Sequence, residues 1–150
     1  MQKAFVLVAV CAGILAVGCG NKDSQVIGKW NGKVILSDKD KKNPAVTAVE
    51  GMLNQSTFEF KSDHAFTASI GAAMEGTWKV EDTKVSLTPT KVAGKSIADI
   101  EKAMAGSPNY ATIKANLDKP MTMTLSSDGK TLTMDSQSSA TTSKMVFSKA

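Results

Sequence analysis

The chain has 150 residues, of which 18 are basic and 14 acidic, giving a formal net charge of +4. Every basic residue is lysine, so the arginine on which bidentate contacts to phosphate and guanine depend is absent from the sequence. Because the lysines are interspersed with acids, the charge indicates a solvated surface, and we expect no nucleic-acid partner.

The first eighteen residues have the composition of a secretory signal. Lys3 provides a short positive region, residues 4–17 are almost wholly apolar, and Gly18 places a small residue directly before Cys19. A charged start, an apolar centre and a small-residue cleavage point define such a signal. As a helix, the apolar run is only about 21 Å long at ~1.5 Å per residue, whereas a hydrocarbon core is roughly 30 Å thick. We therefore expect residues 1–18 to be removed.

The segment Ala16-Val17-Gly18-Cys19 resembles the lipobox of bacterial lipoproteins. This resemblance implies a diacylglycerol on the Cys19 thiol and an N-acyl chain, such as palmitate, on the new amino group; we expect no other cofactor. Each buried methylene contributes about 0.8 kcal/mol, so two or three chains anchor a protein to a membrane. Gly20, in place of aspartate, implies the outer membrane of the cell envelope where the host has one. An ordinary cleaved signal followed by an incidental cysteine is the alternative.

The mature chain divides into a short tether and one domain. Residues 19–25 are polar after the cysteine and indicate a lipidated tether, and residues 26–150 are long enough for one domain with its own core. Because Cys19 is the single thiol left after cleavage, the exported domain has no internal disulfide and depends on that core for stability.

Alternating apolar and polar residues predict eight strands with mostly local connections. The clearest block runs from Phe58 to Val80, and the sequence Ser126-Ser127-Asp128-Gly129-Lys130 is the strongest hairpin signal. The pattern predicts an all-β, mainly antiparallel fold, either an eight-stranded up-and-down barrel or a strongly curled sheet. The predicted strands lie at 26–36, 57–61, 66–70, 74–80, 85–89, 121–125, 132–134 and 145–147.

Short helices interrupt this series of strands. Pro44 opens the first, and Val46, Val49 and Leu53 have the spacing of one apolar face. Ser96 caps the second, with Asp99 in its first turn, and the pattern allows a further short helix at 110–117.

Two stretches resemble bacterial lipocalin-like domains. They are Gly28-x-Trp30 at the start of the first strand and the block from Phe58-x-Phe60 through Ser62-Asp63 to Gly76-Thr77-Trp78, together covering most of residues 26–88. The resemblance implies an eight-stranded barrel. The chain departs from lipocalins in lacking a late arginine beside the first-strand tryptophan and in placing a helix between the fifth and sixth strands. No ligand is carried over from the family.

The order of strands predicts which features share an end of the barrel. The long insertions 37–55 and 90–120 fall on links at one end, and the tight turns at Asp63, Asp82 and Asp128 fall at the other. Trp30 and Trp78 belong to the tight-turn end, where we expect them to act as a plug. The tether reaches roughly 20 Å at ~3.6 Å per residue, so this end should face the membrane.

Methionines gather toward the insertion end. Methionine is flexible and polarizable and suits surfaces that accept varied apolar partners. We interpret the insertion end as the mouth of an apolar cavity for a small hydrophobic ligand, and the alternative is that these side chains fill a loosely specified core. A Cu(I) thioether site lacks supporting His or Cys residues. The residues concerned are Met52, Met74, Met104, Met121, Met123, Met134 and Met145.

No catalytic or metal-binding pattern is visible in the sequence. His64 is the single histidine and lies in a predicted turn, so nucleophile–histidine pairs have no support. Asp38-x-Asp40 lacks the glycine and terminal glutamate of a calcium loop. The sequence therefore predicts a monomeric, non-catalytic envelope lipoprotein that binds a small apolar ligand. The alternative is a tethered structural, protein-interaction or inhibitor module with a filled core and an unidentified protein partner.

Overall fold

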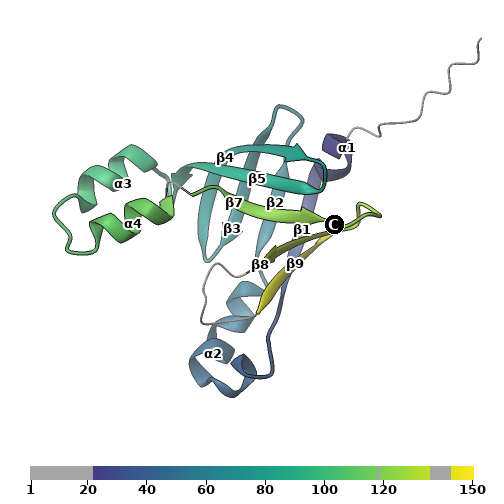
Figure 1. Cartoon of the computed structure of the whole chain (residues 1–150), viewed down its shortest axis with the longest axis horizontal. Coiled ribbons are helices and arrows are strands. Elements are labelled where there is room, and N and C mark those ends of the chain that lie inside the picture. The colour runs from purple at the N-terminus through teal and green to yellow at the C-terminus, as the bar shows by residue number, and fades with distance from the viewer. Residues whose placement is uncertain (1–21, 118, 136–142) are drawn as a thin grey trace, which may run out of the picture.

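The computed structural model describes residues 22–117, 119–135 and 143–150, in which eight antiparallel strands close into a barrel (Figure 1). Neighbouring strands pair in chain order, and β1 pairs with β9 to complete the ring. The predicted all-β up-and-down barrel is therefore confirmed in its closed form, the arrangement that removes exposed sheet edges. The barrel strands are β1 (Gly28–Ile35), β2 (Thr57–Phe60), β3 (Ala65–Ile70), β4 (Ala72–Glu81), β5 (Lys84–Val92), β7 (Met121–Leu125), β8 (Thr131–Asp135) and β9 (Lys144–Lys149).

Side chains alternate between the barrel interior and solvent, as the period of two requires. Along β1, Trp30, Gly32 and Val34 are buried while Lys29 and the other intervening residues are exposed. The interior contains tightly packed aromatic rings, whose centroids are 5.0 to 6.5 Å apart in tilted or edge-on arrangements. The largest fully buried side chains include Trp30, Phe58, Phe60, Phe66, Phe147, Leu87, Met123, Leu125 and Leu132.

Two glycines allow this packing. A Cβ at Gly32 would lie 2.6 Å from a ring carbon of Phe147, and one at Gly76 would lie 2.7 Å from a ring carbon of Phe66. The register of β4 against β5 shifts between Glu75 and Gly76, which is a β-bulge. Both glycines thus provide space for phenylalanine rings inside the barrel.

The helices lie outside the closed ring. The predicted helices at Pro44, at Ser96 and at 110–117 are all confirmed, and the Ser96 hydroxyl accepts a 3.1 Å hydrogen bond from the Asp99 amide as a cap. A two-residue strand, β6 (Lys95–Ser96), pairs antiparallel with the end of β5 just before the second of these helices and was not predicted. The elements are α1 (Lys22–Val26), η1 (Asp40–Lys42), α2 (Pro44–Leu53), α3 (Ile97–Met104) and α4 (Tyr110–Leu117).

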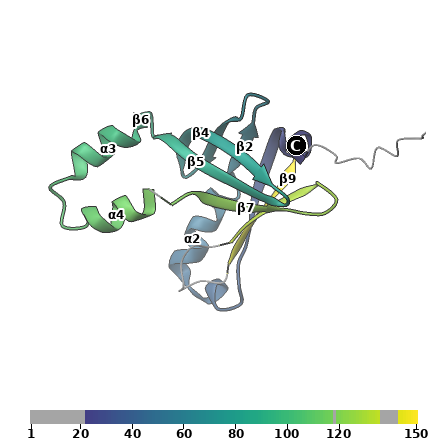
Figure 2. The same cartoon turned by 45° about the horizontal axis from the view of Figure 1, so that its top comes forward.

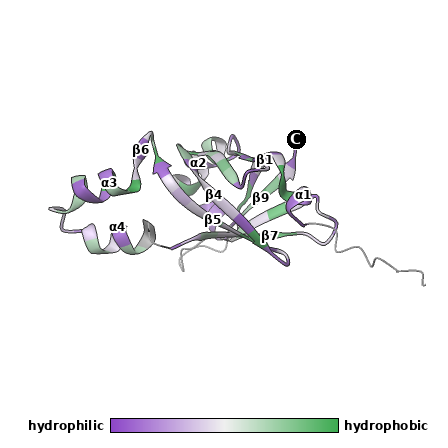
Figure 3. Ribbon diagram, turned by 90° about the horizontal axis from the view of Figure 1, so that it is seen from above, coloured by the Kyte–Doolittle hydropathy of each residue, from purple (hydrophilic) through white to green (hydrophobic). Residues whose placement is uncertain are grey.

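The α3–α4 hairpin projects well beyond the barrel (Figures 1 and 2). Glu101 on α3 accepts a 2.7 Å hydrogen bond from Lys114 on α4, and no residue of α3 is buried. Figure 3 shows hydrophilic and hydrophobic residues mixed along both helices. Within the ranges the structure describes, no helix is both long enough and apolar enough to cross a membrane.

Residues 22–26 correct the prediction of a polar tether leading directly into a strand. They form α1, and β1 begins at Gly28, whose φ of 127° allows the change of direction. Asp23 lies in the first turn, where a negative side chain favours a helix, and Val26 is fully buried. The first strand is therefore shorter than predicted. Residues 1–21, including the signal and Cys19, lie outside the described residues.

Candidate functional site

The end of the barrel with tight turns is sealed. Trp30 is fully buried and its Nε1 donates a 2.7 Å hydrogen bond to the Val26 oxygen, while Trp78 is 3 % exposed and its Nε1 donates to the Lys61 oxygen at 3.2 Å. Lys149 lies 5.4 Å from the centre of the Trp30 ring, a cation–π arrangement. The structure thus places both predicted plug residues, Trp30 and Trp78, in the floor of the barrel.

Helix α1 lies across this sealed end and is attached to three different parts of the barrel. The His64 Nε2 is 3.2 Å from an Asp23 carboxylate oxygen, and the His64 ring is 4.9 Å from that of Trp78. The Lys149 Nζ donates a 2.8 Å hydrogen bond to the Gln25 oxygen. His64, which the sequence placed in a turn without catalytic partners, therefore helps to hold α1.

Four methionines face the interior at the opposite end of the barrel, where the long insertions lie. Met74 pairs with buried Ala68, Met121 with buried Leu87, and Met145 with both buried Val34 and Met134. Cross-strand partners share one face of a sheet, so these side chains point inward. Each is partly buried and packs against the aromatic core. The four methionines, Met74, Met121, Met134 and Met145, are called the mouth methionines below.

The three remaining candidate methionines have different environments. Met123 is 1 % exposed, so it belongs to the packed interior beneath the mouth. Met52 is 60 % exposed on α2, and Met104 is partly buried on the projecting α3. The predicted methionines therefore fall into three groups: four inward-facing residues at the insertion end, one buried residue of the interior, and two residues on the insertions.

The barrel beneath the mouth is occupied by side chains. Met123, Leu87 and Phe58 are each no more than 1 % exposed, and the Phe58 ring packs edge-on against that of Phe147 at 5.0 Å. An apolar group that entered between the mouth methionines would thus soon meet these tightly packed interior side chains.

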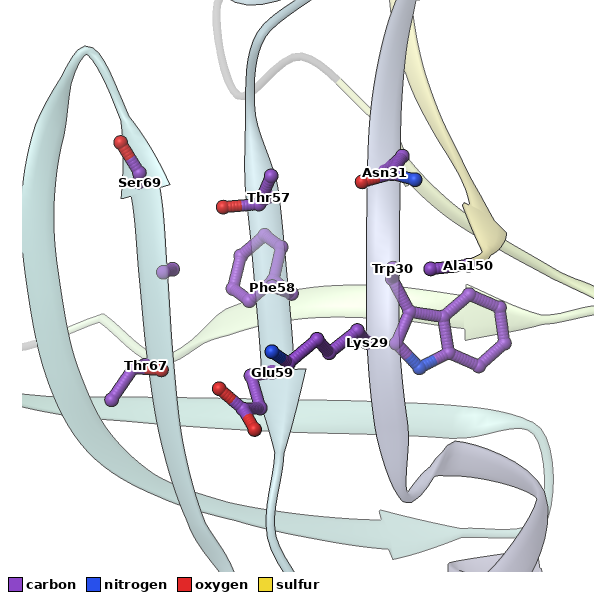
Figure 4. A pocket seen from close by; sticks show the side chains of 10 residues that line it. Lys29, Trp30, Asn31, Thr57, Phe58, Glu59, Thr67, Ser69 and Ala150 are labelled. Carbon is purple, nitrogen blue, oxygen red and sulfur yellow. The ribbon is translucent and has the colours of Figure 1, made fainter.

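A separate hollow of about 370 Å³ lies on the outer face of β1, β2 and β3 (Figure 4). The strand register aligns Lys29, Glu59 and Thr67 in one row and Asn31, Thr57 and Ser69 in the next. Lys29 extends toward Glu59 in Figure 4. Mixed single charges and hydroxyl groups make this a solvated polar surface, and alternation of the strands alone gave no sign that it is hollow.

The two aspartates of the first insertion have structural partners. Asp40 is 6 % exposed, and its carboxylate accepts hydrogen bonds from the hydroxyls of Ser37, at 2.7 Å, and Ser143. Asp38 forms a surface pair with Lys41 at 3.1 Å. Among the residues with described positions, no group of three or more His, Cys, Asp or Glu side chains could hold a metal ion. Asp40 instead connects the insertion to the start of β9.

Comparison with solved structures shows a similarity in fold. No protein-family model matches the sequence, and no curated protein matches it. The chain is similar to the crystal structure of a DUF4847 family protein from Bacteroides vulgatus ATCC 8482. The two sequences are 20 % identical, and the match covers 82 % of this chain and 92 % of the other with a TM-score of 0.42. At this level the similarity carries no functional inference.

Proposed function

We propose that this protein is a lipid-anchored lipoprotein of the bacterial cell envelope whose barrel binds a small apolar ligand without transforming it. The observation that supports ligand binding is the set of four mouth methionines, which face inward yet remain partly exposed. Completing the burial of apolar surface is favourable by about 25 cal/mol per Å². A ligand seated among these thioethers would supply the contacts that the barrel leaves open.

The position of α1 supports the proposed membrane orientation. In the sequence, two residues separate Cys19 from Lys22, where α1 begins. Because α1 lies across the sealed end, acyl chains on Cys19 would hold that end toward the membrane. The mouth methionines would then face away from the anchor. In a host with two membranes, Gly20 favours attachment to the outer one.

A fluorescence titration tests the ligand-binding proposal. The mature chain, residues 19–150 with Cys19→Ser, is titrated with the neutral apolar fluorescent probe N-phenyl-1-naphthylamine, which carries no anionic head. Met121→Lys places a charge among the mouth methionines and should abolish saturable binding. Met52→Lys is the matched control, because Met52 is 60 % exposed on α2. Absence of saturable binding to the wild type, or equal binding by the Met121→Lys variant, would contradict the proposal.

The anchor is tested separately in the host. Growth with an alkyne-tagged fatty acid should label the wild-type protein, and Cys19→Ser should remove the label and release the protein from the membrane fraction. Cys11→Ser is the matched control because Cys11 lies within the proposed signal. Labelling that survives Cys19→Ser would contradict lipidation at this residue.

A tethered structural, protein-interaction or inhibitor module is the second candidate. It is favoured by the filled interior and by the projecting α3–α4 hairpin, whose residues Ile97, Ile100 and Met104 are only partly buried. Native mass spectrometry of protein purified gently from its host separates the two candidates. A co-purifying lipid would favour the ligand-binding function, and a stoichiometric protein partner would favour the interaction module.

A further inference from the structure

The barrel wall has a gap beside the second half of β1. The pairing of β1 with β2 ends at Asn31 and Thr57, so the following residues of β1 have no strand partner on that side. The segment that connects α2 to β2 lies where a strand partner would otherwise pair with β1. The Gly32 amide donates to the Ser56 oxygen at 2.7 Å, and the Val34 amide donates to the Asn54 side chain at 2.8 Å. These bonds satisfy the backbone amides of Gly32 and Val34, but no second strand covers this side of β1.

A groove of about 380 Å³ lies at this gap. This size is within the roughly 300–1,000 Å³ range of small-molecule sites. Val34 and Leu36 belong to the inner face of the barrel and are 5 % and 8 % exposed, whereas Ile35 faces outward and is 55 % exposed. Ile35 and Met52 are the two large hydrophobic side chains classed as exposed among the residues the structure describes. The aliphatic floor of the groove therefore consists of the exposed Ile35 side chain and the small uncovered parts of Val34 and Leu36.

Charged side chains border the aliphatic floor. Lys33 on β1 and Lys41 on η1 carry positive charges, and Glu50 on α2 carries a negative one, so the lining has one net positive charge. Lys41 pairs with Asp38 at 3.1 Å, but both side chains are more than half exposed, and such surface pairs contribute little. Lys41 is thus able to exchange Asp38 for an anion in the groove. The aliphatic stems of both lysines extend the apolar surface beneath their charged ends.

We propose that this groove binds an amphipathic monoanion with a single acyl chain. The chain lies along Ile35 and against Val34 and Leu36, and the anionic head contacts Lys33 and Lys41. A carboxylate of a free fatty acid and a phosphodiester of a lysophospholipid share this chemistry. The groove is lined by residues other than the mouth methionines, so the proposal is independent of ligand binding inside the barrel.

The test is a two-dimensional NMR titration of the mature chain, residues 19–150 with Cys19→Ser, which contains the whole described core. Laurate, 12:0 lysophosphatidylglycerol and neutral monolaurin are added separately below their aggregation concentrations. Saturable chemical-shift changes of the amides of residues 33–36 with laurate alone would identify a fatty-acid site. The same changes with the lysophospholipid alone would identify a phospholipid site. Shifts with both would support the shared anionic chemistry. Equal affinity for monolaurin, or shifts confined to residues 121 and 134, would overturn the proposal.

Outward-facing substitutions test the same groove without disturbing the core. Ile35→Asp removes the exposed apolar contact and adds a negative charge, and Lys33→Glu reverses one of the bordering charges. Each is expected to weaken anion binding at least about tenfold while the thermal unfolding temperature stays close to that of the wild type. Lys84→Glu, on β5 beside the tight turn at Asp82, is the matched charge control and should bind normally. Wild-type affinity in the Ile35→Asp variant would exclude this groove as the binding site.

Discussion

The indole Nε1 of Trp30 donates a 2.7 Å hydrogen bond to the backbone oxygen of Val26, four residues earlier in the chain. This bond joins the end of α1 to the floor of the barrel, and both residues are fully buried. An unsatisfied buried acceptor costs about 1–3 kcal/mol. The short polar segment before the first strand is thus part of the folded domain.

Trp30→Phe is expected to lower the free energy of unfolding by about 2–4 kcal/mol, because it removes this hydrogen bond and also leaves a cavity. Urea denaturation measures the change. Trp78→Phe is a useful comparison, since the Trp78 indole bond to Lys61 is longer, at 3.2 Å, and only partly buried. A smaller loss for Trp30→Phe than for Trp78→Phe would show that the bond to Val26 is not important for stability.

Gly76→Ala is expected to destabilise the barrel by about 1–3 kcal/mol through overpacking. The added methyl would lie 2.7 Å from the Phe66 ring and 2.8 Å from the Pro89 Cα, and the backbone atom cannot move as a flexible side chain can. Gly51→Ala on α2 is the matched control, because nothing lies within 4 Å of its added methyl. It should raise stability by about 0.5–1 kcal/mol through reduced chain entropy and better helix propensity. Equal thermal shifts for the two variants would contradict the close packing at Gly76.

The alternation of side chains allowed much of the barrel to be predicted from the sequence, because a period of two is a local property. Phe58, Phe60 and Phe66 were placed on the inner face, and the structure confirms them there. The limits of β4 and β5 were predicted less accurately. Ala72 and Ala73 give no alternation before Met74, and the bulge at Glu75 and Gly76 lets β5 continue past Pro89 to Val92.

Features that depend on distant contacts could not be predicted. Helix α1 has only five residues, too few to be stable alone, and its stability comes from Trp30, His64 and Lys149. The groove beside Ile35 exists because α2 lies where β2 would otherwise extend, a placement with no local signal. The position of Met145 directly opposite Met134 likewise required the register of β9 with β8.

Ser96→Ala is expected to loosen the start of α3 without unfolding the barrel. Loss of an N-cap side chain costs about 0.5–2 kcal/mol, and the effect should be confined to the projecting α3–α4 hairpin. Hydrogen exchange should accelerate for the amides of residues 97–100 and remain unchanged for β1. Ser96→Thr keeps the hydroxyl that accepts from the Asp99 amide and donates to its carboxylate, so this variant should exchange more slowly than the alanine variant. Uniform acceleration across the barrel strands would show that the hairpin is not an independent unit.

Acid should weaken the turn between β7 and β8. The Ser126 hydroxyl and the Lys130 amide donate hydrogen bonds to the Asp128 carboxylate, and they hold the pKa of Asp128 below its ordinary value of 3.8. A lowered folded pKa stabilises the protein above the unfolded pKa, and this contribution disappears as the pH falls through the folded pKa. Asp128→Asn should therefore lower the unfolding temperature at pH 6 and have less effect as the pH falls below about 4. If the difference in unfolding temperature between the wild type and Asp128→Asn grew as the pH fell, the Asp128 carboxylate would not stabilise the turn in this way.

The proposed membrane orientation predicts which lysines meet lipid headgroups. Lys84 and Lys130 lie beside the tight turns of the sealed end, whereas Lys39 and Lys41 lie in the first insertion. In membranes from the host, a headgroup-directed, amine-reactive cross-linker should capture Lys84 and Lys130 more readily than the insertion lysines. Mass spectrometry of the cross-linked peptides provides the measurement. Preferential capture of Lys39 or Lys41 would contradict the proposed orientation and place the insertion end against the membrane.

The three attachments of α1, to the β2–β3 turn, to β1 and to β9, also determine how an anchored barrel can move. A single flexible connection would let the domain swivel freely above a bilayer. Fastening at several points around the barrel floor instead makes α1 and the barrel turn as one rigid body, so a lipid attached just before α1 would restrict the tilt of the whole domain. The opening at the far end would then sample a narrow cone of directions and stay at a nearly constant height above the surface.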